Sequence, residues 1–205
     1  MREESFSSPL GDTPNAALYF EEGACNVRIR TDHDMADLFR ARFEHKIPDV
    51  RTDDGRVRIN FRRGTGMPGG WWRARGEIVL NAMVPWRIEI RGGVSNLDAD
   101  LTALRLLGLE VGGGVHRLDV AMPDPVRDVG VRIGGGVSHL RLHRPQGSAA
   151  GVHVGHGAAR VRLDGLRLGA VGGGIDWQTN GFDDADDRYE IQIGGGASDL
   201  LVDAR

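Results

Sequence analysis

Histidine pairs are the first residues in this sequence that could do chemistry, because two imidazoles at a short spacing can bind one metal ion. His153 and His156 form an H-x-x-H motif, and His139 and His143 are four residues apart. On a helix such spacings bring two rings to the same ion, but the surrounding residues alternate as strands do, and on a strand neither spacing has this effect. We therefore predict no metal site.

Carboxylates offer two further chemistries. The acidic run 183–187 could bind calcium, since hard cations prefer clustered carboxylates. It lacks the glycine and glutamate positions of an EF-hand loop, so a solvated loop is the favoured interpretation and calcium binding stays open. Asp98, Asp100 and Asp119 lie where some parallel β-helix enzymes that cleave acidic polysaccharides carry aspartates, although outward strand positions are polar by default.

Other catalytic signals are missing from the sequence. The glycine-rich segments are not followed by Gly-Lys-Ser/Thr, and there is no G-x-S-x-G motif. Cys25 is the single cysteine and falls where the related segment 93–97 has Ser95, which favours an ordinary corner residue. We predict that the chain is not an enzyme and binds no cofactor.

Aromatic residues suggest a binding surface instead. Trp71 and Trp72 lie in a glycine-rich tract, and Trp177 and Tyr189 flank the acidic run. Large amphipathic side chains suit a partner or carbohydrate surface. The alternative is that they cap open ends of a repetitive fold.

A glycine-headed segment recurs about every 21 residues and would position these side chains. The intervals between its glycines are 21, 22, 21, 17 and 22 residues. A recurring period of this length is typical of a solenoid, whose units bury their apolar faces by stacking. The segments are 93–97, 114–118, 136–140, 157–161, 174–177 and 196–200.

Apolar residues alternate on both sides of each glycine. Ile88 and Ile90 precede one corner, and Leu97 and Ala99 follow it. This period of two in aliphatic residues predicts short, half-buried strands. Glycine suits the corners between them because it tolerates positive φ and needs no room for a Cβ atom.

Parallel stacking of these units in chain order would align outward residues in ladders. Such ladders control register and keep the surface solvated, but their members are also candidate partner contacts, above all Arg117, His139, Arg141, Arg160 and Arg162. One ladder would hold Asn96, Arg117, His139, Arg160, Trp177 and Asp199, and another Asp98, Asp119, Arg141 and Arg162.

The predicted fold is a single all-β domain, a parallel β-helix-like solenoid with coils of about 21 residues. We expect residues 1–16 to be disordered or extended and residues 17–205 to form the solenoid. Its opening coils over 17–85 are irregular, and its regular repeats occupy 86–205. Residues 34–43 have apolar residues near helical spacing and could form a short helix or a loop. Residues 63–76 are expected to form an exposed loop.

Charge and hydropathy limit the possible partners. The net charge is −3 over 205 residues, without a basic field, so we expect no nucleic-acid binding. No apolar run approaches the eighteen or so residues that a membrane span needs, and no signal peptide is evident. We expect a cytoplasmic protein without direct membrane insertion.

The run from Trp86 through Ile90 into Gly92-Gly93-Val94-Ser95, with similar corners up to Gly195-Gly196-Ala197-Ser198, resembles the bacterial putative-adhesin or "toastrack" β domains. The relatives of these domains include the C-terminal domains of cell-wall-stress response proteins. The resemblance covers about residues 18–202 and implies an interaction or sensing module. It carries no catalytic residues.

We therefore predict a non-catalytic scaffold or protein-interaction module with an unidentified protein partner, in which a homo-oligomer is possible. The alternative is a protein that binds a carbohydrate or small ligand or, on less evidence, acts on a polysaccharide.

Overall fold

The computed structural model describes residues 2–61 and 75–205, in which nineteen strands form two mixed sheets and no helix occurs. The ten-stranded sheet has the order β1 (Glu3–Pro9), β4 (Asp37–Glu44), β7 (Arg75–Asn81), β3 (Ala24–Asp32), β9 (Val94–Asp100), β11 (Val115–Ala121), β13 (Val137–Arg144), β19 (Ala197–Ala204), β15 (Ala158–Leu163), β16 (Leu166–Val171). The nine-stranded sheet has the order β17 (Ile175–Gln178), β14 (Ala149–Val154), β18 (Arg188–Ile193), β12 (Asp128–Ile133), β10 (Arg105–Val111), β8 (Pro85–Ile90), β2 (Ala16–Phe20), β6 (Arg56–Asn60), β5 (Asp49–Asp53). The all-β class predicted from the sequence is confirmed.

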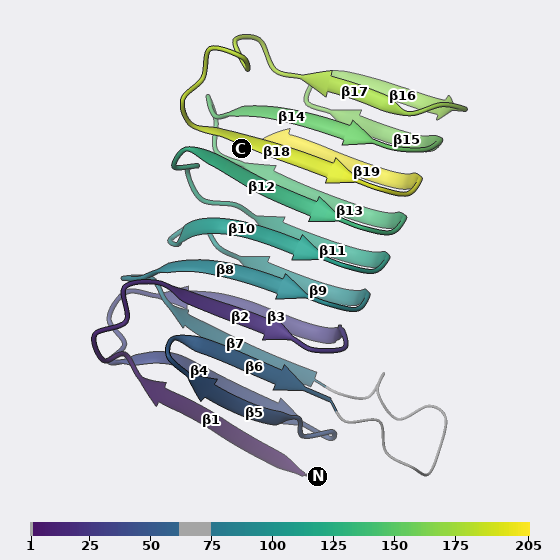
Figure 1. The fold of residues 1–205 in the computed structure, drawn as a ribbon. Helices are drawn as coiled ribbons and strands as arrows, with labels where there is room; N and C mark the ends of the chain where they lie inside the picture. The colour runs from purple at the N-terminus through teal and green to yellow at the C-terminus, as the bar shows by residue number, and fades with distance from the viewer. Residues whose placement is uncertain (1, 62–74) are drawn as a thin grey trace.

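The two sheets pack face to face and form a column (Figure 1). In its middle the strands of each sheet pair in parallel, and the chain passes from one sheet to the other at a glycine corner, as from β8 to β9. Antiparallel strands end both sheets: β1 pairs with β4 and β5 with β6 at one end, while β16 pairs with β15 and β17 with β14 at the other.

The core between the sheets is made by the alternating aliphatic residues. Ile88 and Ile90 of β8 are buried, as are Leu97 and Ala99 of β9 after the corner. Burying one aliphatic side chain contributes about 1.5–3 kcal/mol, and every central coil repeats this contribution. The predicted inward positions on the two sides of each corner are confirmed.

The order of the last coils differs from the expected chain order. β19 pairs in parallel with β13 on one side and with β15 on the other, so the C-terminal strand lies inside the sheet. In the other sheet β18 likewise lies between β12 and β14. The segment at Gly174 is not a parallel corner, because it leads into the antiparallel strand β17. The shortened interval of 17 residues therefore marks a reversal of the chain.

Residues 34–43 do not form a helix. Most of them belong to β4, which pairs with β1 and β7, and Phe39, Ala41 and Phe43 point into the core with a period of two. The turn before β4 is held by the buried Asn81, whose Nδ2 donates hydrogen bonds to the backbone oxygens of Met35 and Asp37 at 2.8 and 2.9 Å. The helical spacing was misleading because pairing on both sides decides the conformation.

The corner glycines are required by close backbone approach and not by positive φ. A Cβ atom on Gly92 would lie 1.3 Å from the backbone oxygen of Glu22, and one on Gly195 would lie 2.5 Å from the backbone nitrogen of Gly136. Neither glycine is among the residues with positive φ. Successive corners thus touch through their backbones, which leaves no space for a side chain.

The predictions for the N-terminal segment 1–16 and for the loop 63–76 can be compared with the structure to different extents. The segment 1–16, expected to be disordered or extended, contains the edge strand β1. Of the expected loop 63–76, Arg75 and Gly76 begin β7, and the rest lies outside the described residues.

Candidate functional site

One outward ladder follows the corners of the column in the ten-stranded sheet. We call it the corner ladder; its members share a positive φ between 51° and 61°, and the residues on both sides of each member pair with the next strand while the member itself is skipped. This bulge-like conformation turns each member out of the sheet. The corner ladder consists, in spatial order, of Asn26, Asn96, Arg117, His139, Asp199 and Arg160.

Polar contacts connect neighbours in the corner ladder. Asn96 Nδ2 donates to Asn26 Oδ1 at 2.8 Å, and His139 Nε2 lies 3.3 Å from Asp199 Oδ2. Arg160 Nε lies 3.3 Å from Asp199 Oδ1. The hydrogen bond from Arg160 lowers the pKa of the Asp199 carboxyl below its usual range. The predicted ladder is therefore real in part, with Asp199 between His139 and Arg160 and with Trp177 absent from it.

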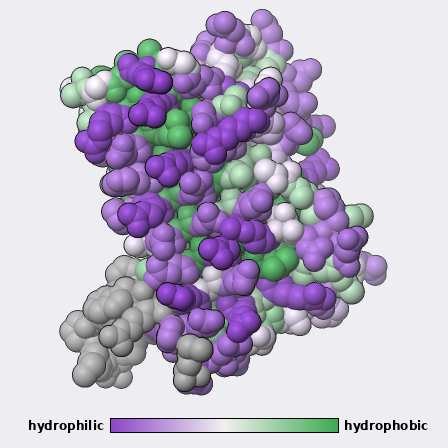
Figure 2. Space-filling view, turned by 180° about the vertical axis from the view of Figure 1, so that it is seen from behind, coloured by the Kyte–Doolittle hydropathy of each residue, from purple (hydrophilic) through white to green (hydrophobic). Residues whose placement is uncertain are grey.

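A second row on the same face is basic. Arg141 of β13 and Arg162 of β15 both pair with Leu201 of β19, which lies between them, and Arg162 pairs with Arg167 of the antiparallel strand β16. We call Arg141, Arg162 and Arg167 the arginine row. All three are exposed, and Figure 2 shows that hydrophilic residues cover much of this face.

The arginine row is unevenly compensated. Arg141 Nη1 lies 3.9 Å from Asp119 Oδ2, as expected from the acid and base in adjacent coils. Arg162 and Arg167 have no ion pair within residues 2–61 and 75–205. This end of the sheet therefore carries uncompensated positive charge. Like charges directly opposite each other on antiparallel strands are destabilising.

Most of the remaining charges on this face serve the fold. His143, 9% exposed at its side chain, lies between two carboxylates, with Nε2 3.1 Å from Asp119 Oδ1 and Nδ1 2.5 Å from Asp203 Oδ1. The buried Arg144 forms an ion pair with Asp164. The contacts of His143 tie β11, β13 and β19 together, and the Arg144 ion pair ties β13 to the turn after β15.

The aspartates considered for polysaccharide cleavage are engaged in structural contacts. Asp98 forms an ion pair with Arg30 at 2.5 Å, and Asp100 accepts a hydrogen bond from the Thr102 hydroxyl at 2.7 Å. Asp119 is shared by Arg141 and His143. The arrangement supports the structural interpretation of these residues.

The nine-stranded sheet carries a shallow depression near its β17 end. We call it the cup, and its floor is at Gly151. It is lined by Gly151, Val152 and His153 of β14, Asp176, Trp177 and Gln178 of β17, Glu190, Ile191 and Gln192 of β18, and Phe182 of the segment between β17 and β18.

Of the aromatic residues predicted for a ligand surface, Trp177 is among the residues that line the cup, and Tyr189 is not. Tyr189 is fully buried, which is a correction to our prediction: its hydroxyl donates to the backbone oxygen of Pro123 at 2.6 Å, and burial raises its pKa. Trp177 pairs with Val152 and is partly buried against the core at the end of the column, which supports the capping role. Trp71 and Trp72 lie outside the described residues.

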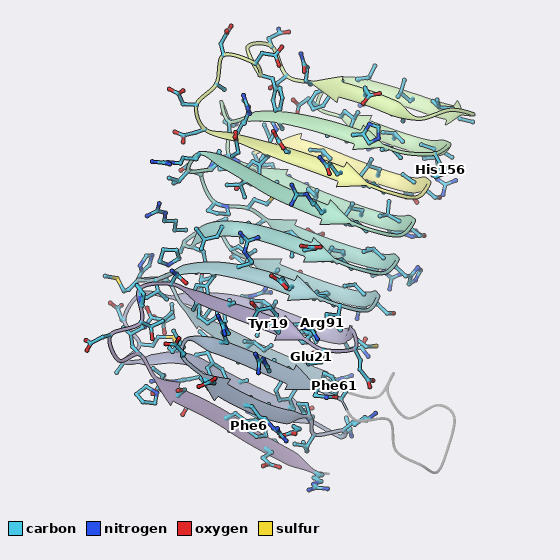
Figure 3. All side chains as sticks on the ribbon, viewed as in Figure 1. Phe6, Tyr19, Glu21, Phe61, Arg91 and His156 are labelled. Carbon is cyan, nitrogen blue, oxygen red and sulfur yellow. The ribbon has the colours of Figure 1, made fainter. Side chains whose placement is uncertain are left out.

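The histidine pairs do not converge on an ion. His153 Nδ1 lies 2.6 Å from Asp176 Oδ1, whereas His156 lies at the corner edge of the column (Figure 3), with Nδ1 3.0 Å from the Gly194 backbone oxygen. Within the described part of the chain, no group of three or more His, Cys, Asp or Glu residues could hold a metal ion. In the acidic run, Asp187 Oδ1 accepts a hydrogen bond from the Arg127 backbone at 2.5 Å.

Cys25 occupies the predicted corner position. It pairs with Ser95 of the next coil, as the comparison of the segments indicated. Burial raises the pKa of its thiol, and a hydrogen bond with Ser95 opposes this shift. A raised pKa disfavours the reactive thiolate.

Sequence reasoning missed several residues of both surfaces. Arg167 was missed because the hairpin from β15 to β16 is not a parallel coil. Phe182 and Glu190 were missed because the sequence did not show that the C-terminal coil, which contains β18, is inserted beside β14. One signal was available: Gly151 interrupts the outward polar positions of its strand.

The stacked sheets, the recurring glycine corners and the polar outer faces define a repetitive all-β protein. The sequence pattern described as the N-terminal domain of toast_rack, DUF2154, matches residues 2–143, so the chain belongs to the toast_rack family. Similarity to solved structures extends over the whole chain. A putative cell adhesion protein from Clostridium sporogenes has a TM-score of 0.73 at 17% identity, with 100% of this chain and 99% of that chain covered, and thus shares its fold.

A putative adhesin from Bacteroides fragilis has a TM-score of 0.33 at 6% identity, with 98% of this chain and 97% of that chain covered, which is too low to bear on the fold. No protein with a curated description matches the sequence. In the described residues, no helix has the length and apolar character needed to cross a bilayer.

Proposed function

We propose that this protein is a non-catalytic interaction module that binds an acidic surface of a partner protein through the arginine row. The single observation that carries the proposal is the cross-strand pair of Arg162 and Arg167. Two exposed guanidinium groups opposite each other oppose pairing of their strands. An acidic partner would remove this repulsion, so relief of the repulsion contributes to the free energy of binding.

The architecture suits such a role. We regard the parallel ladders as the coils of a β-solenoid, whose strands lie about 4.8 Å apart. Arg162 and Arg167 are then separated by one strand spacing, and Arg141 lies two spacings beyond Arg162. Arginine presents a planar fork that matches carboxylates in two-point contacts, and a rigid sheet holds three of them in a line.

Membership of the toast_rack family supports a structural or interaction role and no particular reaction. Asp98, Asp119, His143 and Asp203 of the ten-stranded sheet form contacts within the fold, which also favours binding over catalysis.

The proposal is tested by quantitative co-purification of a tagged protein from cells that express it. The test variant carries Arg162→Glu and Arg167→Glu. The control carries the same change of charge on the other sheet, at the exposed Arg105 and Arg132. We expect a stoichiometric partner that is retained by the control, is released at high salt and is lost from the test variant.

Circular dichroism must show that both variants keep the β signal. A partner that binds the test variant as well as the unaltered protein would contradict the role of the arginine row. Loss of the β signal in the test variant alone would instead mean that the row is structural.

A further inference from the structure

The cup around Gly151 has the dimensions of a small-ligand site. Its volume is about 390 Å³, and small-ligand sites usually measure roughly 300–1,000 Å³. Outward side chains of three neighbouring strands surround it, since β14 pairs with β17 on one side and with β18 on the other. Because Gly151 has no side chain, the ring of Phe182 can rest directly against this strand.

Phe182 forms a fixed aromatic wall of the cup. A Cβ atom on Gly151 would lie only 2.8 Å from Phe182 Cζ, so the edge of the ring rests where a side chain would otherwise be. Arg188 supports the ring from one side, with its Cζ 5.1 Å from the ring centroid. Such a cation–π contact contributes about 0.5–1 kcal/mol at an exposed site and limits movement of the ring.

The other side of the ring is turned toward the polar rim. Arg188 pairs with Ala149, whereas His153 and Gln192 pair with each other four residues further along the same strands. Phe182 rests on Gly151, between these two positions. The guanidinium and the pair of His153 and Gln192 therefore lie on opposite sides of the ring.

The rim is rich in hydrogen-bond acceptors. His153 Nδ1 lies 2.6 Å from Asp176 Oδ1, and Gln178 Nε2 donates to Asp183 Oδ2 at 3.4 Å. Glu190 Oε1 lies 3.9 Å from Arg188 Nε, which leaves its second oxygen able to accept. Carboxylates accept in pairs, and amides such as that of Gln192 both donate and accept.

We propose that the cup binds one residue of a neutral or amino saccharide. A sugar ring has an apolar face of C–H groups, which would pack on Phe182, and hydroxyl groups at its edge, which would bond to Glu190, Gln192 and His153. The carboxylates of Asp176 and Glu190 disfavour acidic sugars and phosphates by repulsion. The site lies on the nine-stranded sheet and does not depend on the arginine row.

The test uses three monosaccharide probes: methyl glucoside, glucosamine and glucuronate. Saturation-transfer NMR and calorimetry measure their binding to the protein. An array of neutral, amino and acidic oligosaccharides extends the panel. We expect binding of neutral or amino probes with dissociation constants near the millimolar range, and no binding of glucuronate.

Three variants locate the site. Phe182→Ala should weaken binding at least tenfold, because the packing wall is lost. Gln192→Ala, at an exposed position where stability should be unchanged, should weaken saccharide binding several-fold. Glu190→Gln should weaken the binding of glucosamine more than that of methyl glucoside. The matched control Glu110→Gln changes an exposed carboxylate of the same sheet outside the cup and should have no effect.

Three outcomes would overturn the proposal. They are a blank array with no binding of the neutral and amino monosaccharides, a preference for acidic saccharides, and saccharide binding that neither Phe182→Ala nor Gln192→Ala changes.

Discussion

Leu200 of the C-terminal strand pairs with Leu140, sixty residues earlier in the chain, and on its other side with Val161. The last strand thus completes the middle of the ten-stranded sheet. Both sheets become continuous only when this coil is inserted, because β18 fills the corresponding place between β12 and β14.

Leu200→Ala should therefore destabilise the protein strongly. Leu200 is 1% exposed, and removing a fully buried leucine side chain costs roughly 2–5 kcal/mol. The matched control is Leu166→Ala on the edge strand β16, where 41% exposure predicts a much smaller loss. Urea unfolding of both variants measures the difference, and equal losses would argue against a closing role for β19.

Gly195→Ala should destabilise the protein, whereas Gly173→Ala should be nearly neutral. Both are the middle glycine of a Gly-Gly-Gly segment, but an added Cβ meets backbone at 2.5 Å in Gly195 and nothing within 4 Å in Gly173. Overpacking of this kind costs about 1–3 kcal/mol. Thermal unfolding compares the two variants, and similar melting temperatures would show that the corner can relax.

Arg167→Glu should stabilise the fold and weaken partner binding. Opposite Arg162, it converts a like-charge pair into an attractive one, worth roughly 0.2–1 kcal/mol. Urea unfolding at low and high salt measures the gain, which should shrink as salt screens the charges. A loss of stability at low salt would mean that the two guanidinium groups do not repel each other in the folded protein.

Arg160→Gln should raise the pKa of Asp199 toward its ordinary value of 3.8, because the hydrogen bond from Arg160 is the largest cause of the lowered pKa. In the unaltered protein the folded pKa lies below the unfolded one. This contribution to stability is therefore present above the unfolded pKa and is lost as the pH falls through the folded pKa, below about pH 4.

Carboxyl carbon shifts followed by NMR between pH 2 and 6 give this pKa directly. The control Arg205→Gln removes a neighbour of Asp203 and should leave the pKa of Asp199 unchanged. If Arg160→Gln also leaves it unchanged, another group holds the pKa of Asp199 low.

The corner ladder was only half predictable. Alternation placed Asn96, Arg117, His139, Arg160 and Asp199 at equivalent positions, because the glycine corner and the first inward residues recur in every coil. Asn96 and Asp199 are of residue types enriched at positive φ, but arginine rarely adopts it, so Arg117 and Arg160 hid this conformation in the sequence. It is imposed by the bulge after each corner.

The all-β class, the inward aliphatic pairs and the glycine corners could be predicted from the sequence. Alternation is local, and every central coil meets its neighbour at a similar corner, so both signals recur along the chain. The choice of neighbouring strands depends on the tertiary fold. The insertion of β19 between β13 and β15, the reversal at Gly174 and the meeting of Phe182 with Gly151 depend on contacts between segments far apart in the chain. Two parallel coils with the same alternating pattern can pair equally well with several others, so local pattern alone leaves their order undetermined.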